Sequence, residues 1–401
     1  MDVTHLQALS ERPGVPGLLQ GLGEGQARFV GGSVRDNLLG IDAKDLDLAT
    51  PLSPFEVMRR CGAAGIKTVP TGIAHGTVTA ISDGQVVEIT TLRADLATDG
   101  RHATVAFTDD WRLDAERRDF TINALYWDPS DGTLHDYFSG LEDLAASRVR
   151  FIGEPLQRIA EDHLRILRFF RFHARFAGGS EPDPAGFAAC IARANDLMAL
   201  SRERIADEWL KLLALPDPAP TVRLMVEAGI LVPVLPEVTA DALPLLDQLL
   251  QIERTAGIGP DPLRRFAALL PRDPLLAEKV AARLKLSNKA RKRLSAAASG
   301  DLGLGPQALA YELGVESAQD RLLLSGDAEG ARQLESWTVP KLPIGGGVLI
   351  ARGLEPGPAV AKTLKAIEAR WVAEGFPNEE RFAQLVDEAL AGSRQGGRQL
   401  L

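Results

Sequence analysis

The spacing of apolar residues changes near residue 141, and this change constrains the fold more than any other feature of the sequence. Between residues 28 and 140, short β-like runs alternate with glycine-containing turns. From about residue 141 onward, apolar residues recur at helical spacing and prolines mark the breaks between segments. We therefore expect an α+β fold, in which an N-terminal domain with a small mixed β-sheet is followed by an all-α remainder.

Composition places the chain among globular proteins of more than one domain. It has 401 residues, of which 45% are apolar and 25% are charged. Cys61 and Cys190 lack the spacing of metal ligands, so neither a disulfide framework nor a structural zinc is expected. No window approaches the run of about 18 apolar residues that a membrane span needs, and the first residues resemble neither a signal nor a transit peptide. We expect a cytoplasmic protein with no membrane partner and no obligate protein partner.

Basic residues are concentrated in two stretches although the net charge is −9. A polyanion-binding protein usually presents a basic footprint, so the location of the positive charge matters more than the total. The first stretch is rich in arginine and covers residues 148–175. The second contains Lys285, Lys289, Arg291, Lys292 and Arg293. The second stretch is interpreted either as a set of phosphate contacts or as a solvated helix face.

A pair of glycines follows a short β-like run in the segment Phe29-Val30-Gly31-Gly32-Ser33-Val34-Arg35. Glycines let backbone amides approach an anion closely, and the N-terminus of the helix expected next favours negative charge. This pattern predicts a phosphate-binding turn formed by Gly31, Gly32, Ser33 and Arg35. The segment lacks the spacing of a P-loop or a dinucleotide-binding fold, so a simple turn remains an alternative.

Three acidic residues are candidates for a metal site. Asp45 and Asp47 alternate with leucines, and in a strand they would lie on one face about 7 Å apart. Glu88 belongs to the second strand of a predicted hairpin whose turn is Ser82-Asp83-Gly84. Carboxylates that converge on adjacent strands repel one another unless a cation such as Mg²⁺ neutralises them. The alternative is the polar face of a surface strand.

Several segments together carry a resemblance to a known family. In order along residues 25–215 they read FVGGSVRDNLLG, KDLDLAT, TGIAHGTVTA, VEITTLR, RRDFTINALYWD, GLEDL, RIAEDHLRILRFFRF and SRERIADEWLKLL. This series resembles class II CCA-adding tRNA nucleotidyltransferases and the closely similar bacterial poly(A) polymerases. Beyond residue 215 the resemblance is thin.

The resemblance implies a reaction and a division of the chain. The reaction is template-independent addition of CMP, CMP and AMP to the 3′ acceptor end of tRNA, with CTP and ATP as substrates. Residues 1–140 would form the nucleotidyltransferase head, and residues 141–215 a helical neck that reads the base and binds RNA. Residues 216–401 would form a helical body and tail that hold the tRNA, with the basic stretch from Lys285 to Arg293 as its phosphate contacts.

The resemblance also assigns roles to residues of the head. Asp45 and Asp47 would bind two Mg²⁺ ions, and Glu88 would help to orient or activate the 3′-hydroxyl group. The glycine turn with Ser33 and Arg35 would hold the triphosphate. The segment that contains Arg117, Asp119 and Asn123 would contact the ribose and phosphates of the nucleotide.

The expected base-reading residues are Asp162 and Arg165, which stand at i and i+3 and would be neighbours on one helix. Asp162 can only accept hydrogen bonds and Arg165 can only donate them. Cytosine and adenine each offer an amino donor beside a ring-nitrogen acceptor, so the pair fits CTP and ATP and mismatches UTP and GTP. Arg168 would support the pair or contact the triphosphate. Without the resemblance, the pair would be interpreted as a weak salt bridge.

Features within the resembling segments favour full CCA addition over its alternatives. The run His75-Gly76-Thr77-Val78 resembles the form usual in CCA-adding enzymes, and the stretch from Arg93 to Phe107 is as long as their flexible loop. Polyadenylation, CC-only or A-only addition, and a non-catalytic RNA-binding relative remain the alternatives. Ser201 is expected to cap a helix, with Arg204 and Glu208 in structural pairings.

Overall fold

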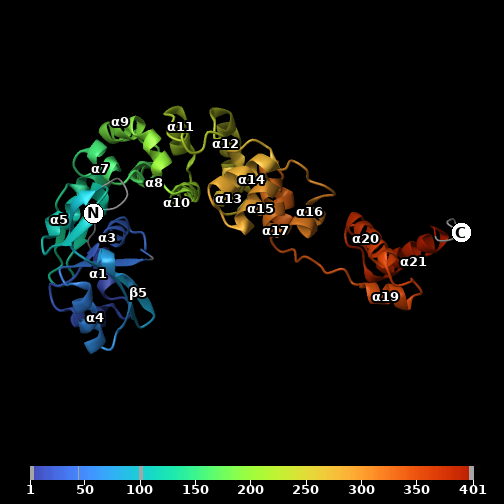
Figure 1. Ribbon diagram of the computed structural model, residues 1–401, viewed down its shortest axis with the longest axis horizontal. Coiled ribbons are helices and arrows are strands. Elements are labelled where there is room, and N and C mark those ends of the chain that lie inside the picture. Colours follow the sequence, from blue (N-terminus) through green and yellow to red (C-terminus); the bar gives the residue numbers. More distant parts are fainter. Residues whose placement is uncertain (1–3, 44, 99–102, 397–401) are drawn as a thin grey trace. The chain divides into compact units, whose positions relative to one another are not determined.

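The computed structural model describes residues 4–43, 45–98 and 103–396, shown in Figure 1. The chain forms two compact units, Met1–Pro236 and Glu237–Leu401. This boundary differs from the expected domain ends at residues 140 and 215, and the three-part division stays a prediction. Within the described ranges, no helix is both long enough and apolar enough to cross a membrane.

The first unit contains a mixed sheet with the strand order β3-β4-β5-β2-β1-β8-β9. Strands β2 and β5 are parallel, and the other neighbouring pairs are antiparallel. The sheet confirms the expected α+β fold. Its strands are β1 (Arg28–Val30), β2 (Leu46–Thr50), β3 (Lys67–Gly72), β4 (Thr77–Ser82), β5 (Gln85–Thr91), β8 (Leu125–Trp127) and β9 (Leu134–Asp136).

The predicted hairpin is formed by β4 and β5. Its two turn residues, Asp83 and Gly84, have φ values of 48° and 80°. Positive φ at both positions is the geometry of a type I′ turn, whose twist matches that of the flanking strands. Asp-Gly supplies it cheaply because glycine has no Cβ and aspartate tolerates the left-handed region. The turn fixes the register that pairs Thr79 with Glu88.

The stretch from Arg93 to Phe107, expected as a flexible loop, is a second hairpin. Strand β6 (Arg93–Thr98) pairs antiparallel with β7 (Ala103–Phe107). The alternating β-branched and small residues of Ala-Thr-Val-Ala-Phe favour a strand, which explains the difference from the expected loop. The connection at residues 99–102 lies outside the described residues.

Helices alternate with the strands along the chain and continue to residue 227. In the N-terminal part they are α1 (Thr4–Ser10), α2 (Val15–Leu22), α3 (Gly32–Leu38), α4 (Pro54–Ala63), α5 (Trp111–Glu116) and α6 (Gly140–Ala145), with 3₁₀ turns η1 (Ile73–His75) and η2 (Thr121–Asn123). They are followed by α7 (Pro155–Glu161), α8 (Arg165–Phe176), α9 (Pro184–Ala192), η3 (Ala194–Ala199), α10 (Arg202–Leu213) and α11 (Ala219–Glu227).

Helix α8 separates an apolar face from a basic one. The expected core residues Ile166, Leu167, Phe169 and Phe170 are all buried. Burial of one such apolar side chain contributes about 1.5–3 kcal/mol to the free energy of unfolding. The arginines of the other face pair with acids of neighbouring elements, namely Arg168 with Asp119, Arg171 with Glu208 and Arg175 with Asp36. The arginine-rich stretch is therefore used largely to join α8 to the head and to α10.

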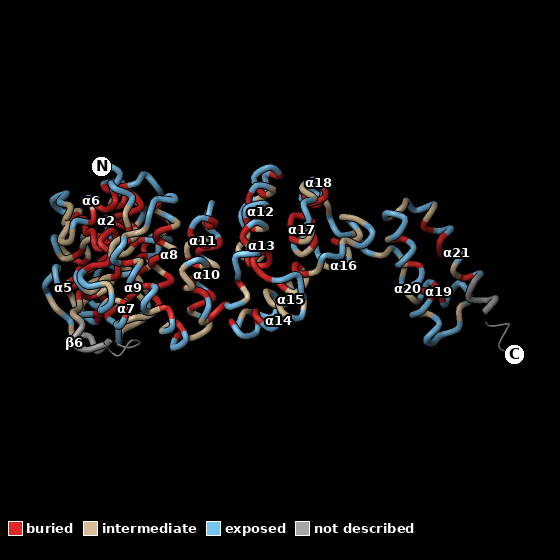
Figure 2. Tube along the Cα trace, turned by 90° about the horizontal axis from the view of Figure 1, so that it is seen from above, coloured by how far each residue is buried: buried red, intermediate tan, exposed pale blue. Residues whose placement is uncertain are grey.

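The second unit is entirely helical within its described residues. It contains η4 (Ala240–Ala242), α12 (Leu243–Ala256), α13 (Pro262–Ala268), α14 (Pro274–Arg283), α15 (Asn288–Ala297), α16 (Pro306–Leu313), α17 (Val315–Leu324), α18 (Ala328–Gln333), α19 (Gly346–Ala351), α20 (Pro358–Ala373) and α21 (Glu379–Gly396). Buried residues lie in patches along these helices, as Figure 2 shows in red. Ile367, Trp371 and Leu385 belong to a core formed by the last three helices. The expected all-α remainder is confirmed.

Candidate active site

Asp47 and Glu88 occupy paired positions on the parallel strands β2 and β5. Side chains at paired positions of neighbouring strands project from the same face of a sheet. Both carboxylates line a cavity of about 220 Å³. The remaining lining residues are Val30, Leu48, Thr90, Arg93, Arg117 and Arg118. Two acidic side chains and three arginines therefore line the same cavity.

The environment of Asp47 favours a bound cation. Burial, followed by the negative charge of Glu88, raises the pKa of Asp47 to about 6. Asp45 adds a smaller effect in the same direction. A carboxylate whose ionised form is disfavoured by burial and by like charges is stabilised when a cation neutralises the group. Oxygen donors of this kind fit Mg²⁺.

Asp45 lies differently from the expectation. It is exposed and forms a bend directly before β2, which begins at Leu46. We predicted that Asp45 and Asp47 both belong to one strand. This prediction is wrong for Asp45, which precedes the strand by one residue. In the part of the chain that the structure describes, no three His, Cys, Asp or Glu side chains form a group that could hold a metal ion. The structure thus brings Glu88 beside Asp47 without closing a three-acid site.

The glycine turn joins β1 to α3. Gly31 has a φ of 66°, which favours glycine, and a Cβ there would lie 3.3 Å from Nη1 of Arg118. The hydroxyl of Ser33 donates to the Val30 carbonyl at 2.8 Å and lies 3.4 Å from the carbonyl oxygen of Asp47. Ser33 is buried, so its side chain fastens the turn to β2 in this structure.

Arg35 is also buried, with 3% of its surface exposed. Its guanidinium donates to Asp36 and to the side-chain oxygen of Asn123, and it lies 4.4 Å from the ring centre of Phe176. Burial lowers the pKa of Arg35. Arg35 therefore links α3, η2 and α8, and it is not among the residues that line the cavity.

Asp119 connects the head to α8. Its Oδ1 accepts from the Asn123 side chain at 2.9 Å, and its Oδ2 accepts from Nε of Arg168 at 2.8 Å. Burial alone would raise the pKa of Asp119, but the charge of Arg168 and the bond from Asn123 outweigh it and lower the pKa to about 2. Asp119 is therefore ionised at neutral pH. This arrangement brings together three predicted nucleotide-binding residues, Asp119, Asn123 and Arg168.

Asp162 and Arg165 do not share one helix, and this expectation is wrong. Helix α7 ends at Glu161, Asp162 is extended with φ −151° and ψ 106°, and α8 begins at Arg165. The Asp162 carboxylate accepts from the Leu164 amide at 3.1 Å. Aspartate breaks helices in this way because its side chain competes for backbone donors.

The two expected base-reading residues have different partners. Arg204 donates to both oxygens of Asp162, at 3.1 and 2.8 Å. Arg165 donates to Glu161 at 2.6 Å and to the carbonyl of Arg117 at 3.0 Å. The expected structural pairings of Arg204 and Glu208 are confirmed. Each side chain is held separately, and the role of the pair in reading bases stays a prediction.

Three polar residues of the cavity, Arg118, Arg93 and Thr90, were not singled out as site residues in the sequence analysis, although Arg118 lies in the segment expected to contact ribose and phosphate. Arg118 stands beside Arg117 in the sequence, so the Arg-Arg pair itself was a signal. Thr90 lies two residues after Glu88 in β5 and therefore faces the same side of the sheet. Arg93 opens β6, and no feature of the sequence indicated that the cavity extends to it.

The basic stretch in the second unit begins at Lys285, just after the end of α14, and continues into helix α15. Lys285, Lys289 and Lys292 are exposed, and Lys289 lies 2.9 Å from Glu316. Arg291 is partly buried and lies 3.1 Å from Glu278. These four residues remain candidates for contacts with phosphate groups.

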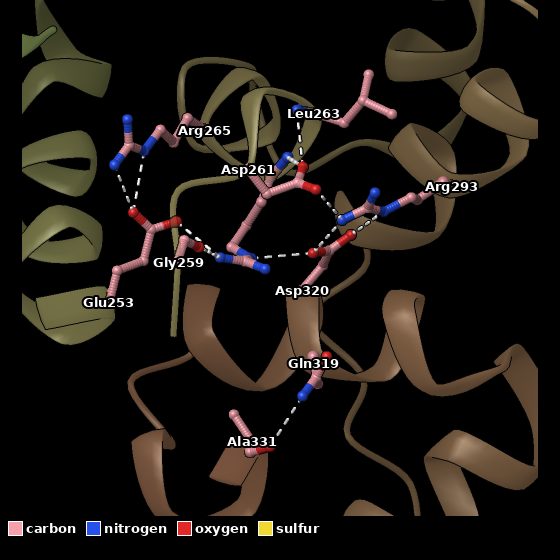
Figure 3. A network of polar contacts seen from close by, with 10 residues as sticks. Glu253, Gly259, Asp261, Leu263, Arg265, Arg293, Gln319, Asp320 and Ala331 are labelled. Carbon is pink, nitrogen blue, oxygen red and sulfur yellow. Dashed lines mark hydrogen bonds and ion pairs between the residues drawn. The ribbon is translucent and has the colours of Figure 1, made fainter. Parts of the chain in front are cut away.

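Arg293 departs from the expected RNA-binding role. Only 12% of its side chain is exposed, and it donates to Asp320 at 2.6 Å and pairs with Asp261 at 2.8 Å. Figure 3 shows this network, in which Asp320 also accepts from Arg264 and Glu253 accepts from Arg265. Because its donors pair with these two acids, one of them fully buried, Arg293 is not among the proposed RNA contacts.

Comparisons with known proteins show which family the chain resembles. Residues 27–150 match the family described as Poly A polymerase head domain, and residues 181–241 match the family described as probable RNA and SrmB-binding site of polymerase A. The mitochondrial CCA tRNA nucleotidyltransferase 1 of Homo sapiens is 34% identical over 373 residues, covering 88% of this chain and 85% of that protein. The CCA-adding enzyme of Lacticaseibacillus paracasei is 34% identical over 371 residues, covering 88% and 90%.

Solved structures show the same fold. The CCA-adding enzyme of Bacillus stearothermophilus in complex with CTP has a TM-score of 0.75 and 29% identity, and the match covers 98% of this chain and all of that one. The Thermotoga maritima CCA-adding enzyme complexed with tRNA has a TM-score of 0.70 at 22% identity, with 98% of each chain covered. The likeness thus extends over both compact units.

Proposed function

The chain belongs to the family of CCA-adding tRNA nucleotidyltransferases, and from this premise we propose that it adds CMP, CMP and AMP to the 3′ end of tRNA, using CTP and ATP. The observation that carries the proposal is the register of β2 and β5, which places Asp47 beside Glu88 in a cavity also lined by arginines. Acids suited to a cation next to donors suited to phosphate are the groups that nucleotidyl transfer requires.

The proposed reaction is an in-line substitution at the α-phosphate of the nucleotide. The 3′-oxygen of the tRNA forms a bond to the α-phosphorus, and the bond from that phosphorus to the bridging oxygen of the β-phosphate breaks, so that pyrophosphate leaves. Glu88, which is exposed at the cavity, would orient the attacking hydroxyl and accept its proton. Arg117 and Arg118 stabilise the charge that develops on the phosphate oxygens.

Asp45 and Asp47 are the proposed ligands of two Mg²⁺ ions. Bound there, the ions would supply positive charge for the attacking and leaving oxygens. The raised pKa of Asp47 supports this assignment, since a cation removes the cause of the shift. The glycine turn, with Gly31, Gly32 and Ser33, is the proposed support of the triphosphate, and the buried Arg35 would position this turn through its bonds to Asp36 and Asn123.

Selection of CTP and ATP is assigned to Asp162 and Arg165. Arg204 holds the Asp162 carboxylate, and Glu161 with the Arg117 carbonyl holds the Arg165 guanidinium. Each group is therefore fixed before a base arrives, and fixed polar groups discriminate better than mobile ones. The ribose and the phosphates of the bound nucleotide are proposed to contact three neighbouring residues, Asp119, Asn123 and Arg168.

The remaining proposals concern the tRNA and the location of the enzyme. We assign the head to residues 1–140, the neck to 141–215 and the tRNA-holding body and tail to 216–401, with Lys285, Lys289, Arg291 and Lys292 as phosphate contacts. A cytoplasmic location is proposed from the sequence. Detection of the tagged chain mainly in an organelle fraction would contradict that location.

The function is tested with tRNAs that end at the discriminator base, at C and at CC. Each is incubated with Mg²⁺ and with CTP, ATP, UTP or GTP singly and in combination, and the 3′ ends are then sequenced. Defined CCA ends on all three substrates are expected. Addition that stops at CC, or that starts only from CC, would identify a partial enzyme. Long A tails on unrelated RNA would identify a poly(A) polymerase.

A further inference from the structure

We propose that Asp114 is a positioning residue for the reaction, which holds the arginines of the cavity ready for the pyrophosphate portion of the nucleotide. The inference rests on the proposed function, because it concerns the same cavity. Asp114 lies in α5 and does not line the cavity itself. Its effect would pass through Arg117 and Arg118.

The carboxylate of Asp114 is the meeting point of several donors. Its Oδ1 accepts from Nε of Arg117 at 2.9 Å, and Nη2 of Arg117 lies 2.8 Å from the same oxygen. Its Oδ2 accepts from Nη2 of Arg118 at 3.2 Å and from the hydroxyl of Tyr126 at 2.7 Å. The Tyr126 hydroxyl in turn accepts from Nε of Arg118 at 2.9 Å.

A further donor connects Asp114 to the hairpin of β6 and β7. The backbone amide of Arg93, the first residue of β6, donates to Oδ1 of Asp114 at 3.3 Å. Arg93 also lines the cavity, and its side chain donates to the His75 carbonyl at 2.5 Å. One carboxylate therefore fixes two cavity arginines and the backbone of the third.

The electrostatics show that Asp114 acts as an anion. Its side chain is 1% exposed. Burial alone would raise the pKa of Asp114, but the charges of Arg118 and Arg117 and the bond from Tyr126 outweigh burial and lower the pKa to about 2. Within the group formed by Asp114, Arg117 and Arg118, one negative charge faces two guanidinium groups and leaves one net positive charge, which favours an incoming polyphosphate.

Fixing these arginines in advance has a consequence for binding. An arginine side chain has many rotamers, and ordering it only when the ligand arrives weakens the affinity. Arg118 also approaches the glycine turn closely, since a Cβ on Gly31 would lie 3.3 Å from its Nη1. Asp114 thus sets the position of Arg118 relative to the proposed triphosphate support.

The test replaces Asp114 by asparagine and measures inorganic pyrophosphate binding by calorimetry in Mg²⁺ without tRNA. The amide removes the charge and places an N–H group against arginine donors. We expect pyrophosphate affinity to fall about 10-fold or more and KM for CTP to rise by a similar factor, with KM for tRNA unchanged. Asp114→Glu should restore part of the affinity.

Asp320→Asn is the matched control. Asp320 is also a fully buried carboxylate that accepts from two arginines, Arg264 and Arg293, but it lies in the second unit. We expect this variant to lose thermal stability while its pyrophosphate affinity stays within twofold of the parent protein. A general effect of losing a buried ion pair would instead weaken pyrophosphate binding in both variants.

Specific outcomes would overturn the proposal. They are an Asp114→Asn protein that binds pyrophosphate as tightly as the parent, or one whose KM rises equally for CTP and tRNA. If Asp114→Asn does not fold, Tyr126→Phe provides the test. This change removes the hydroxyl that donates to Asp114 and accepts from Arg118. A smaller loss of pyrophosphate affinity is then expected, and no loss would refute the role. Because pyrophosphate binding needs no tRNA, this result is independent of whether the parent enzyme makes CCA ends.

Discussion

Asp47 on β2 is paired in register with Glu88 on β5, and the two strands run parallel although they lie far apart in the sequence. The pairing sets two carboxylates side by side at one cavity. Burial, followed by their repulsion, is the cause of the raised pKa of Asp47. The protein therefore maintains an arrangement that is unfavourable by itself and becomes favourable with a bound cation.

The first prediction concerns pH and metal. The pKa of Asp47 is about 6 in the folded protein and lower in the unfolded chain, so the folded state holds this proton more tightly. The contribution of Asp47 to the free energy of unfolding is fully present at a pH below the pKa of Asp47 in the unfolded chain. It is lost as the pH rises through about 6, the pKa in the folded protein. Without metal, Asp47→Asn should therefore raise the melting temperature relative to the parent more at pH 7.5 than at pH 4.5.

Addition of Mg²⁺ completes that experiment. At pH 7.5 the ion should raise the melting temperature of the parent protein and have a smaller effect on Asp47→Asn, because binding to the folded state alone stabilises it. Scanning calorimetry with EDTA or Mg²⁺ measures both effects. Equal shifts in the two proteins would mean that Asp47 is not a ligand.

Activity provides the second prediction. Asp47→Asn and Asp45→Ala should each lower the rate of CMP addition about 100-fold or more, while tRNA binding changes little. Single-turnover assays with labelled CTP, combined with filter binding of tRNA, separate the two effects. Lost tRNA binding with normal turnover would contradict the metal assignment of either residue.

The third prediction tests base selection. Asp162→Asn replaces one carboxylate oxygen with an NH2 group. In the proposed complex this NH2 group would face the amino group of cytosine or adenine, so that two donors would oppose each other. The value of kcat/KM for CTP should fall about 10- to 100-fold, and the preference for CTP over UTP should narrow. Asp196→Asn is the control, since Asp196 is exposed to a similar extent, 30% against 31%, and is also paired with an arginine. An unchanged CTP to UTP ratio in Asp162→Asn would remove the base-reading role.

Salt dependence tests the proposed RNA contacts. Replacing Lys285, Lys289 and Lys292 with alanine should weaken tRNA binding and reduce the slope of log Kd against log salt by about 0.7–0.9 for each tRNA phosphate that a lysine no longer neutralises. Lys67→Ala serves as control, because Lys67 is exposed on β3 in the other unit. A slope that stays the same in the triple variant would assign these lysines to a solvated surface.

Arg293 should behave differently from its lysine neighbours. Its guanidinium pairs with Asp320, which is fully buried, and with Asp261, so removing it takes from Asp320 one of two arginine partners, the other being Arg264, and takes from Asp261 its ion pair. Arg293→Ala should therefore cost about 3–5 kcal/mol of stability. Chemical denaturation measures this loss. A stability close to that of the parent, together with a reduced salt slope for tRNA binding, would restore Arg293 to the RNA-binding set.

Local sequence patterns predicted much of the fold. Asp83-Gly84 predicted the hairpin because few residue pairs accept positive φ at two successive positions. The helical spacing of Ile166, Leu167, Phe169 and Phe170 predicted a buried helix face. The same reasoning failed at Asp162, where a side chain that accepts a backbone amide ended the helix that the apolar spacing alone would have continued.

The α+β organisation, the family and most of the residue types at the candidate site could be predicted from the sequence, because turns, helical periodicity and motif order are local properties of the chain. Which partners those residues have was decided by the tertiary structure. It placed Asp47 beside Glu88, paired Asp162 with Arg204, buried Arg293 in an ion network and made Asp114 the common acceptor of the cavity arginines. Such partnerships join residues from separate elements, and they depend on which donors and acceptors remain unpaired once the elements have packed.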